Sequence, residues 1–511
     1  MSDSRLVSAR PNLLKKAWQK VLVETVQLRR VLSFVAGTFM VLTAGTLYGF
    51  GAYSQNLAKA LDRDNVQLLG SMGDIGTYLG LTMGLLFDFT GPAVTSLVAC
   101  LFTFMGYFFT WLVLENHIPN SFALLCLFYF LIGQGSYASV VATIGCNVSN
   151  FPPAHKGKVS GFFVGLYGFS SLVFTLIYQY GLDYDVRHFF FLLSMCVAVT
   201  NLFGLIFLRK VPSPQAYATL SGPLPPKVTS LEATQLLLVE EDAEDSNDDD
   251  DADDGEKEKQ LNNKQNQESE EEDLGGPSSS DPWDPACKPY RMILRLEFWL
   301  LFITFFCISG IGLMWKNIVG SVTASFDMSK SVTNVYVIIF GSLNSVSRVL
   351  VGIASDLLVR FVPRPLWFIL SAALMLVVYL SYLIFGEKVL ILIDIGTAVG
   401  YGVTFATVIA LTITYFGLPY YGMNSSIITL APAGAGFLLT FVSEQLTESV
   451  TPSDSSECKG NVCYKWNFLV ASCFLILAIL VSSSLLVYHV RREKLHRREL
   501  FLQKQKEIEV Y

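Results

Sequence analysis

Two short stretches, "GLLFDFTGP" at residues 84–92 and "GIASDLLVR" at residues 352–360, decide the fold of this chain. Each closes an apolar run of about twenty residues, the length that spans a bilayer, and sets a glycine four residues before an aspartate. A carboxylate in lipid costs about 2.5–3.5 kcal/mol on insertion scales, so Asp88 and Asp356 need partners. The glycine lies one helical turn away, which lets a neighbouring helix approach and offer N-terminal N–H groups or a basic side chain.

Composition places the chain in a membrane. Of its 511 residues, 52% are hydrophobic and 15% are charged, against about 25% charged residues in an average soluble domain. The long apolar runs lack the alternation of barrel strands. The sequence therefore predicts an all-α membrane protein with twelve transmembrane helices. The approximate spans are 31–54, 66–87, 93–114, 121–144, 159–178, 188–208, 298–319, 331–354, 365–385, 389–411, 422–442 and 467–489.

The twelve spans form two groups of six, and the two aspartates close the second span of each group. This arrangement indicates a duplicated transporter. Between the groups, residues 240–273 hold 18 acids and 3 lysines, a balance of −15, which favours a disordered tether; an acidic docking site is the alternative. The predicted parts are an amphipathic segment (1–30), a six-helix half (31–208), a disordered acidic linker (209–293), a second six-helix half (294–489) and a basic tail (490–511).

Basic residues at both ends of the chain predict its orientation. The net charge is −7, so the chain outside the acidic tract carries +8. Because an even number of spans returns the chain to the same side, the positive-inside rule places both termini in the cytosol. Near the N-terminus, Leu14 and Trp18 oppose Lys15 and Lys16, so we expect an amphipathic helix on the cytosolic lipid surface. A partner helix of the calmodulin-binding type is the alternative.

The paired stretches resemble the loop motif of the major facilitator superfamily, a G-x-x-x-D-x-x-G pattern with basic residues that follows the second helix of each half. The first copy lacks the basic residues, since Phe89 and Thr90 stand after Asp88. The resemblance implies the major facilitator fold and a gating motif that latches the outward-open state. The matching residues are Gly84, Asp88 and Gly91 in the first half, and Gly352, Asp356 and Arg360 in the second.

Other stretches resemble the Nodulin-like branch of that superfamily. They are "LYGFGAYSQNLA" after the first span, "NFPPAHKGKVSGFFVGLYGFSS" before the fifth, "LEFWLLFITFFCISGIGLMWKNIVGSV" in the seventh and "YGVTFATVIALTITYFG" in the tenth, together with paired cysteines before the twelfth. The likeness covers both membrane halves but not the linker. That branch is related to transporters of monocarboxylates and oxalate, so the resemblance implies a transporter.

In this superfamily the first, fourth, seventh and tenth helices line the central cavity, and polar residues recur there. In the tenth span, Asp394, Thr397 and Tyr401 share one helical face. In the seventh, Lys316 lies near the same membrane boundary as Asp394, which allows a pair that acts as an outer gate or a carboxylate site. A Lys316 that snorkels outward is the alternative. Tyr48 and Gln134 are further candidates, or helix-packing groups.

Two more ionisable residues lie within the second and eighth spans. Asp74 has no basic residue beside it, so it is a candidate for proton coupling, with a structural hydrogen-bonded aspartate as the alternative. Arg348 lies two turns from Asp356. It is interpreted as a structural residue that neutralises Asp356 and nearby glutamate or carbonyl groups, with anion binding as the alternative.

The polar loops add a candidate disulfide and candidate sorting signals. Cys458 and Cys463 lie in a loop predicted to face away from the cytosol, where a disulfide is allowed; two free thiols are the alternative. Patterns typical of adaptor-binding sorting signals occur in the linker. They do not decide between an endolysosomal or vacuolar membrane and the plasma membrane. The signal residues are Tyr217, Leu220, Glu232, Leu236 and Leu237.

The expected function is secondary active transport of a small organic solute, an anion or a carboxylate, by alternating access with protons as a coupling ion. A non-transporting solute sensor on the same scaffold is the alternative. The sequence shows no nucleophile–base constellation, Walker loop or metal-ligand cluster, so we expect no enzyme activity, cofactor, metal or nucleic-acid partner. The expected partners are membrane lipid, the solute, protons and sorting adaptors.

Overall fold

A computed structural model describes residues 26–63, 66–152, 155–211, 286–359, 361–451 and 458–510. All of them belong to one compact unit. Most of the N-terminal segment, residues 212–285 of the predicted linker with its candidate sorting signals, and Arg360 lie outside the described residues. The end of the linker was predicted to be disordered, and this is wrong: Pro289–Ile293 form a short helix in which Met292 is buried. Within the described part the chain is helical, and its extended pairing is limited to a single bridge between Ala286 and Gly417. The all-α prediction is confirmed.

The first half begins with a membrane helix over Val26–Ser54, which includes the 3-10 turn η1 (Gly45–Gly49). The helix therefore starts about five residues before the predicted span. A kink of non-helical backbone lies within α4, at Gly91 (φ 78°). The remaining elements are α2 (Phe50–Leu61), α3 (Gln67–Tyr78), α4 (Leu81–Leu114), α5 (Phe122–Asn150), α6 (Lys156–Leu176), the π-helical turn η3 (Ile177–Gly181) and α7 (Val186–Phe207).

The second half repeats this plan. Its last helix continues without a break from the membrane into the basic tail, so the tail predicted at 490–511 is an extension of the twelfth span. The elements are α11 (Pro289–Ile293), α12 (Leu296–Ser325), α13 (Lys330–Leu357), α14 (Leu366–Phe385), the 3-10 turn η5 (Gly386–Val389), α15 (Leu390–Phe416), α16 (Tyr421–Val450) and α17 (Val462–Val510).

Ten helical stretches in the described residues are long and apolar enough to cross a membrane. Two of them, Leu68–Leu114 and Leu366–Phe416, contain 47 and 51 residues. At 1.5 Å per residue each is about 70 Å long or more, twice what a bilayer core of about 30 Å requires. Glycines with left-handed φ, Gly91 and Gly386, interrupt them, so each contains two predicted spans. The twelve predicted stretches are therefore all helical.

Polar side chains inside the helices are mostly satisfied by their own backbone. Thr103, Thr407 and Ser482, for example, donate to the carbonyl four residues earlier at 2.6–2.7 Å. In lipid an unbonded hydroxyl is unfavourable, and this back-bonding removes the penalty without a partner helix. Isolated Ser and Thr therefore carry little information about a solute site.

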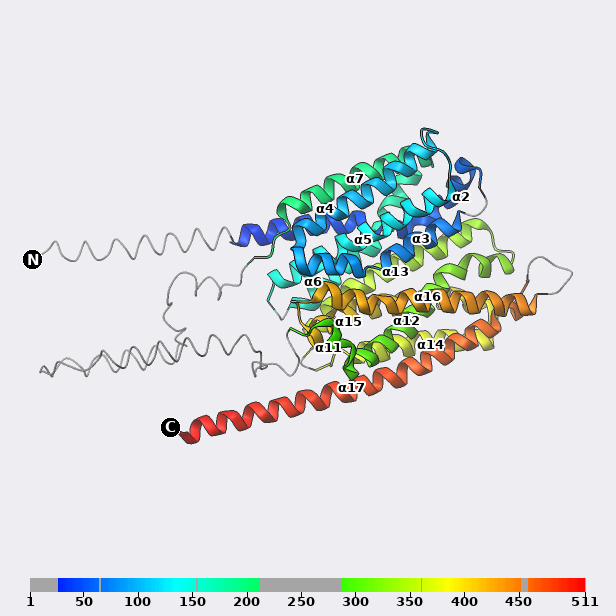
Figure 1. Ribbon diagram of the computed structural model, residues 1–511. Helices are drawn as coiled ribbons and strands as arrows, with labels where there is room; N and C mark the ends of the chain where they lie inside the picture. The colour runs from blue at the N-terminus through cyan, green and yellow to red at the C-terminus, as the bar shows by residue number, and fades with distance from the viewer. Residues whose placement is uncertain are drawn as a thin grey trace, which may run out of the picture. The chain divides into compact units, whose positions relative to one another are not determined.

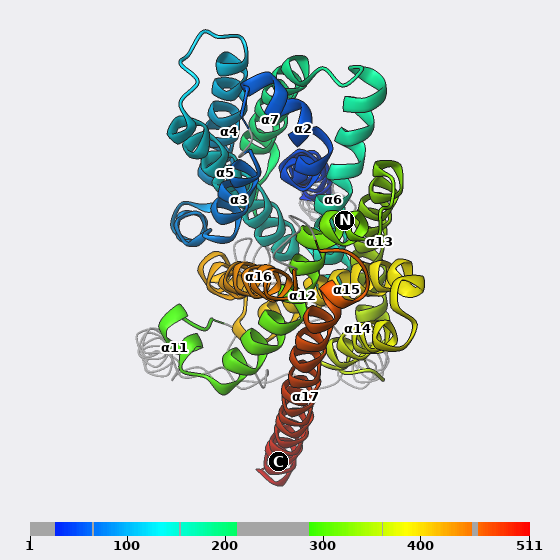
Figure 2. The same cartoon turned by 90° about the vertical axis from the view of Figure 1, so that its right-hand side faces the viewer.

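The two halves meet mainly along two helix pairs, α6 with α13 and α4 with α16, and α6 also contacts α15. The first-half helices run from blue to green in Figures 1 and 2, and the second-half helices from green to red. Glycines permit the close approach: a Cβ on Gly161 would lie 2.6 Å from the Gly352 Cα, and a Cβ on Gly352 would lie 2.6 Å from the Gly157 carbonyl. No larger residue fits at this crossing without a backbone shift.

Candidate functional site

Asp88 bridges the two halves at the start of α16. Its Oδ1 accepts from the Gly422 N–H and its Oδ2 from the Met423 N–H, both at 2.8 Å. These N–H groups belong to the first turn of α16, where they have no partner in the helix and carry the positive end of its dipole. Gly84 makes the approach possible, because a Cβ there would overlap the Gly422 carbonyl.

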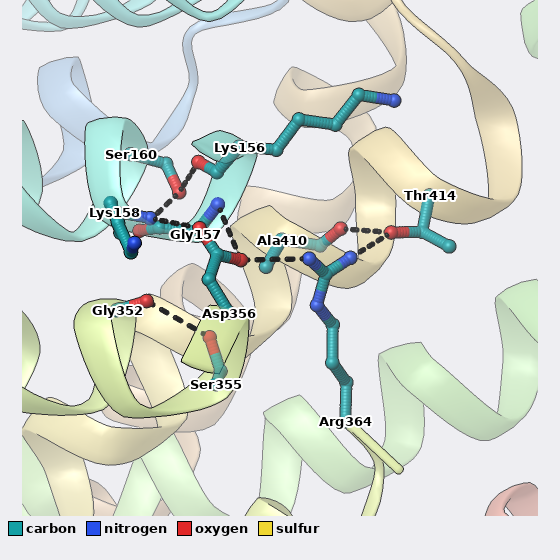
Figure 3. Close-up of polar contacts among 10 residues, drawn as sticks. All are labelled: Lys156, Gly157, Lys158, Ser160, Gly352, Ser355, Asp356, Arg364, Ala410 and Thr414. Atoms are coloured by element: carbon teal, nitrogen blue, oxygen red, sulfur yellow. Dashed lines mark hydrogen bonds and ion pairs between the residues drawn. The ribbon is translucent and has the colours of Figure 1, made fainter. Parts of the chain in front are cut away.

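Asp356 forms the corresponding bridge in the other direction (Figure 3). Its Oδ1 accepts from the Gly157 N–H at 3.1 Å, and its Oδ2 accepts from the Lys158 N–H at 2.7 Å. Both donors lie in the first turn of α6. The Asp356 side chain is fully buried, so a charge there depends on these donors and on a counter-ion. We call the Asp88 and Asp356 bridges the two latches, and the side of the molecule that holds them the latch end.

Each latch also has a basic residue, and neither was identified from the sequence. Arg364 donates from Nη2 to Asp356 Oδ1 at 2.9 Å and from Nη1 to the Thr414 hydroxyl at 2.6 Å. The charge of Lys210 acts on Asp88, and its Nζ lies 4.9 Å from the centre of the Phe87 ring. Lys210 follows α7, more than a hundred residues after Asp88, so a local motif search does not find it.

A second cluster lies between the halves, away from the latches. The Lys316 Nζ lies 5.0 Å from the centre of the Tyr48 ring, which joins α12 to the first half. The Tyr48 ring contacts the Tyr167 ring edge-on at 5.0 Å. Asp74 is partly buried, and its charge acts on the hydroxyls of Tyr167 and Tyr401. We call these residues, together with Tyr78 and Arg348, the central cluster.

Arg348 is fully buried in this cluster. Its Nε donates to Asn344 Oδ1 at 3.0 Å and its Nη1 to the Val164 carbonyl at 3.1 Å. Its guanidinium lies 4.7 Å from the centre of the Phe405 ring and 5.7 Å from that of Tyr401. The Nη2 group has no hydrogen-bond partner, and no carboxylate among the described residues forms an ion pair with this arginine.

The prediction that Arg348 neutralises Asp356 is therefore wrong, whereas its contact with a nearby carbonyl, that of Val164, is present. Arg364 takes that role because the loop after α13 folds back toward Asp356, whereas Arg348 points across the interface to α6. The hydroxyls of Tyr78 and Tyr401 are buried and have no hydrogen-bond partner. The cluster thus combines a cation without a counter-ion and two hydroxyls with unused bonding capacity.

Asp394 does not pair with Lys316, contrary to the sequence-based expectation. Its Oδ1 accepts from the Trp315 indole N–H at 2.7 Å, and its buried Oδ2 has no partner. Trp315 and Lys316 are adjacent on α12, so their side chains point about 100° apart: one covers Asp394, and the other reaches Tyr48. Thr397 bonds within α15 and to the Tyr379 hydroxyl, so this part of the face lies inside the second half.

Gln134 has a structural role. Its amide donates to the Gly76 and Leu79 carbonyls at 2.8 and 2.9 Å, and its oxygen accepts from the Thr82 hydroxyl at 2.9 Å. These bonds satisfy the backbone where α3 ends and α4 begins. At the opposite side of the molecule from the latches, Cys458 and Cys463 form a disulfide.

Comparison with known proteins agrees with this architecture. The Nodulin-like family model matches residues 30–223, so the first half of the chain carries a Nodulin-like region. Escherichia coli FucP, a fucose:proton symporter, shares 12% identity with a TM-score of 0.53 over 89% of this chain and 99% of its own. XylE, a proton:xylose symporter, shares 14% identity with a TM-score of 0.58 over 89% and 95%. The fold is that of the major facilitator superfamily.

Sequence relatives extend the likeness. Protein NUCLEAR FUSION DEFECTIVE 4 of Arabidopsis thaliana is 24% identical over 89% of this chain and 88% of its own length. A protein of Debaryomyces hansenii named "Probable transporter MCH1" is 26% identical over 35% of this chain and 37% of its own. The membrane-spanning helices and this fold together make the chain a multi-pass integral membrane protein.

Proposed function

We propose that the chain is a secondary active transporter of a small organic anion, with a carboxylate as the recognised group. The observation that carries this proposal is Arg348. A buried guanidinium without a counter-ion is unfavourable. One N–H group of Arg348 has no partner, and the guanidinium lies 5.7 Å from the centre of the Tyr401 ring, whose hydroxyl also has no partner. An anionic solute supplies the missing charge and accepts from these groups.

The rest of the central cluster supports the same class of solute. Lys316 offers a second cation that is partly exposed, and Tyr48 beneath it is also partly exposed. Arg348 and Tyr401 are buried deeper. We infer that the solute meets Lys316 first and reaches Arg348 when the halves rearrange. Asp74, partly buried in the same cluster, is the proposed proton carrier, because protonating it removes the only carboxylate charge we assign to the cluster.

The two latches support alternating access. Both connect a carboxylate of one half to the first helical turn of the other, so both must break when the latch end opens. We place the latch end in the cytosol together with both termini, because Lys158, Lys210, Arg364 and Arg492 gather there, in keeping with the positive-inside rule. The choice between endolysosomal, vacuolar and plasma membrane rests on sorting adaptors that would bind the linker.

The test is uptake by the purified chain in proteoliposomes. Labelled monocarboxylates, dicarboxylates, amino acids and sugars are offered with and without an inward proton gradient. We expect carboxylate uptake that the gradient accelerates, a loss of at least tenfold in Lys316→Ala, and a loss of the gradient effect in Asp74→Asn. Lys388→Ala is the matched control, since Lys388 is an exposed lysine in η5 outside the cluster.

Two outcomes would overturn the proposal. Uptake of sugars in preference to carboxylates, unchanged in Lys316→Ala, would contradict the anion site. Binding of a carboxylate, seen as thermal stabilisation of the wild-type chain, without uptake of any solute would favour the solute sensor. A ligand at 100 times its dissociation constant stabilises the folded state by about 2.7 kcal/mol, which a thermal-shift measurement detects.

A further inference from the structure

A cavity at the latch end lies outside the central cluster. It has a volume of about 220 Å³ and is formed where the loop after α13, the end of α15 and the tail part of α17 meet. Three of its lining residues are cations, Arg364, Lys494 and Arg497, and one is an acid, Glu493. Glu493 already has partners, since His489 and Arg497 lie 3.2 and 3.7 Å from its oxygens.

The cavity differs from a general basic surface in two ways. Arg364 is nearly buried, with 11% of its side chain exposed, and its Nε has no hydrogen-bond partner. The other two cations come from one exposed face of α17, which is held against α12 by the ion pair between Arg492 and Glu297 at 2.8 Å. The tail helix is therefore fixed in place, and the cations converge on one concave site.

Apolar side chains border the same cavity. Phe361 and Val359 line it and are 84% and 48% exposed, and Leu357 next to them is 62% exposed. Exposed apolar residues at the end of a membrane helix face the lipid near its headgroups. A basic cavity with an apolar border fits a ligand that has an anionic head and an acyl tail.

We propose that this cavity binds a phosphate-bearing anion, and that the phosphorylated headgroup of a membrane lipid is its source. The lining cations take the phosphate groups, and the acyl chains lie over Leu357 and Phe361. Free phosphate has the same anionic group but lacks the acyl chains. The apolar border therefore adds to the affinity for the lipid but not to the affinity for free phosphate. The site does not depend on which solute the chain transports.

Arg364 connects this site to a latch. Arg364 both lines the cavity and donates to Asp356. A phosphate that engages Arg364 competes with Asp356 for it and leaves the buried carboxylate without its counter-ion, which disfavours the closed arrangement in which Asp356 is buried against α6. By reciprocity, opening of the latch end strengthens anion binding. Lipid composition would then set how readily the transporter opens to that side.

The binding test uses the purified full-length chain with three probes: short-chain phosphatidylinositol 4,5-bisphosphate, inositol trisphosphate and inorganic phosphate. The variant Lys494→Ala/Arg497→Ala removes two lining cations. Because each cation contributes about 1 kcal/mol toward an anionic lipid, we expect binding to weaken about 30-fold. The matched control is Arg491→Ala/Arg498→Ala, which removes the same charge from exposed positions of the same helix outside the cavity.

Equal losses in the two double variants, or no binding of any probe, would overturn the site. Tighter binding of the lipid than of inositol trisphosphate supports the lipid source, and equal binding of both supports a soluble phosphate ligand instead. The link to the latch is measured by hydrogen exchange at the Gly157 and Lys158 amides, which donate to Asp356. We expect the bound lipid to accelerate this exchange; unchanged exchange would overturn the competition for Arg364.

Discussion

At the scale of single residues, the two arginines of α13 and its following loop have opposite environments. Arg364 has a carboxylate partner in Asp356, whereas Arg348 has only neutral acceptors and two aromatic rings. Breaking a buried ion pair leaves an uncompensated charge, but removing an unpaired buried charge relieves desolvation. A substitution to methionine therefore distinguishes a structural arginine from one kept for a ligand.

We expect Arg348→Met to leave the free energy of unfolding unchanged or to raise it by about 1 kcal/mol, and to abolish carboxylate uptake. Arg364→Met is the comparison, and we expect it to destabilise the chain by about 3–5 kcal/mol because Asp356 loses its counter-ion. Thermal unfolding and uptake are measured on both. A loss of stability in Arg348→Met as large as in Arg364→Met would show that Arg348 holds the fold together and is not kept for a solute.

At the scale of elements, glycines set how closely the helices of the two halves approach. Gly84 in α4 faces the first turn of α16, and a Cβ there would overlap the Gly422 carbonyl and the Ser426 hydroxyl. Overpacking a close contact costs about 1–3 kcal/mol. A larger side chain at position 84 would therefore destabilise only the conformation in which α4 and α16 touch. The glycine thus tunes the equilibrium between conformations.

We expect Gly84→Ala to shift the chain toward the open latch end by about 5- to 150-fold, the equivalent of 1–3 kcal/mol. Hydrogen exchange at the Gly422 and Met423 amides, which donate to Asp88, reports the opening. The control is Gly320→Ala in α12, where a Cβ meets nothing within 4 Å. That substitution should stabilise the helix by about 0.5–1 kcal/mol without changing the exchange. Slow exchange in Gly84→Ala would contradict a role for this contact in opening.

At the scale of the whole molecule, the two latches have the same construction, and each half supplies the aspartate of one latch and the helix N-terminus of the other. The first half offers Asp88 to α16, and the second half offers Asp356 to α6. If the halves move as rigid bodies, neither latch can open alone. The two carboxylates, although 268 residues apart in sequence, then act on a single equilibrium.

We expect Asp88→Asn and Asp356→Asn each to accelerate amide exchange at both latches, because each substitution removes charge-assisted hydrogen bonds that contribute about 1.5–3 kcal/mol. The double variant should open further than either single one. Asp327→Asn, which breaks an exposed ion pair with Lys459, is the control and should change neither latch. Faster exchange at the substituted latch only would show that the latches open independently.

Much of the fold was predictable because membrane helices are encoded locally. Apolar runs near the bilayer length located every membrane helix but not the short α11, and the glycine-to-aspartate spacing located Asp88 and Asp356. The central cluster was predictable in part: Tyr48, Asp74, Lys316, Arg348 and Tyr401 were identified as polar residues within spans. Tyr167 carried no such signal, since aromatic residues are common throughout the chain.

The sequence by itself determined which segments cross the membrane, that the chain is duplicated, and which carboxylates need partners, because each of these properties depends on residues within a turn or two of one another. Only the tertiary structure decided the partners: Arg364 and not Arg348 for Asp356, Lys210 for Asp88, and Trp315 and not Lys316 for Asp394. These pairings depend on how the helices pack and rotate against each other. Residues one position apart on a helix point about 100° apart, so spacing along the chain does not reveal which of them meets the charge.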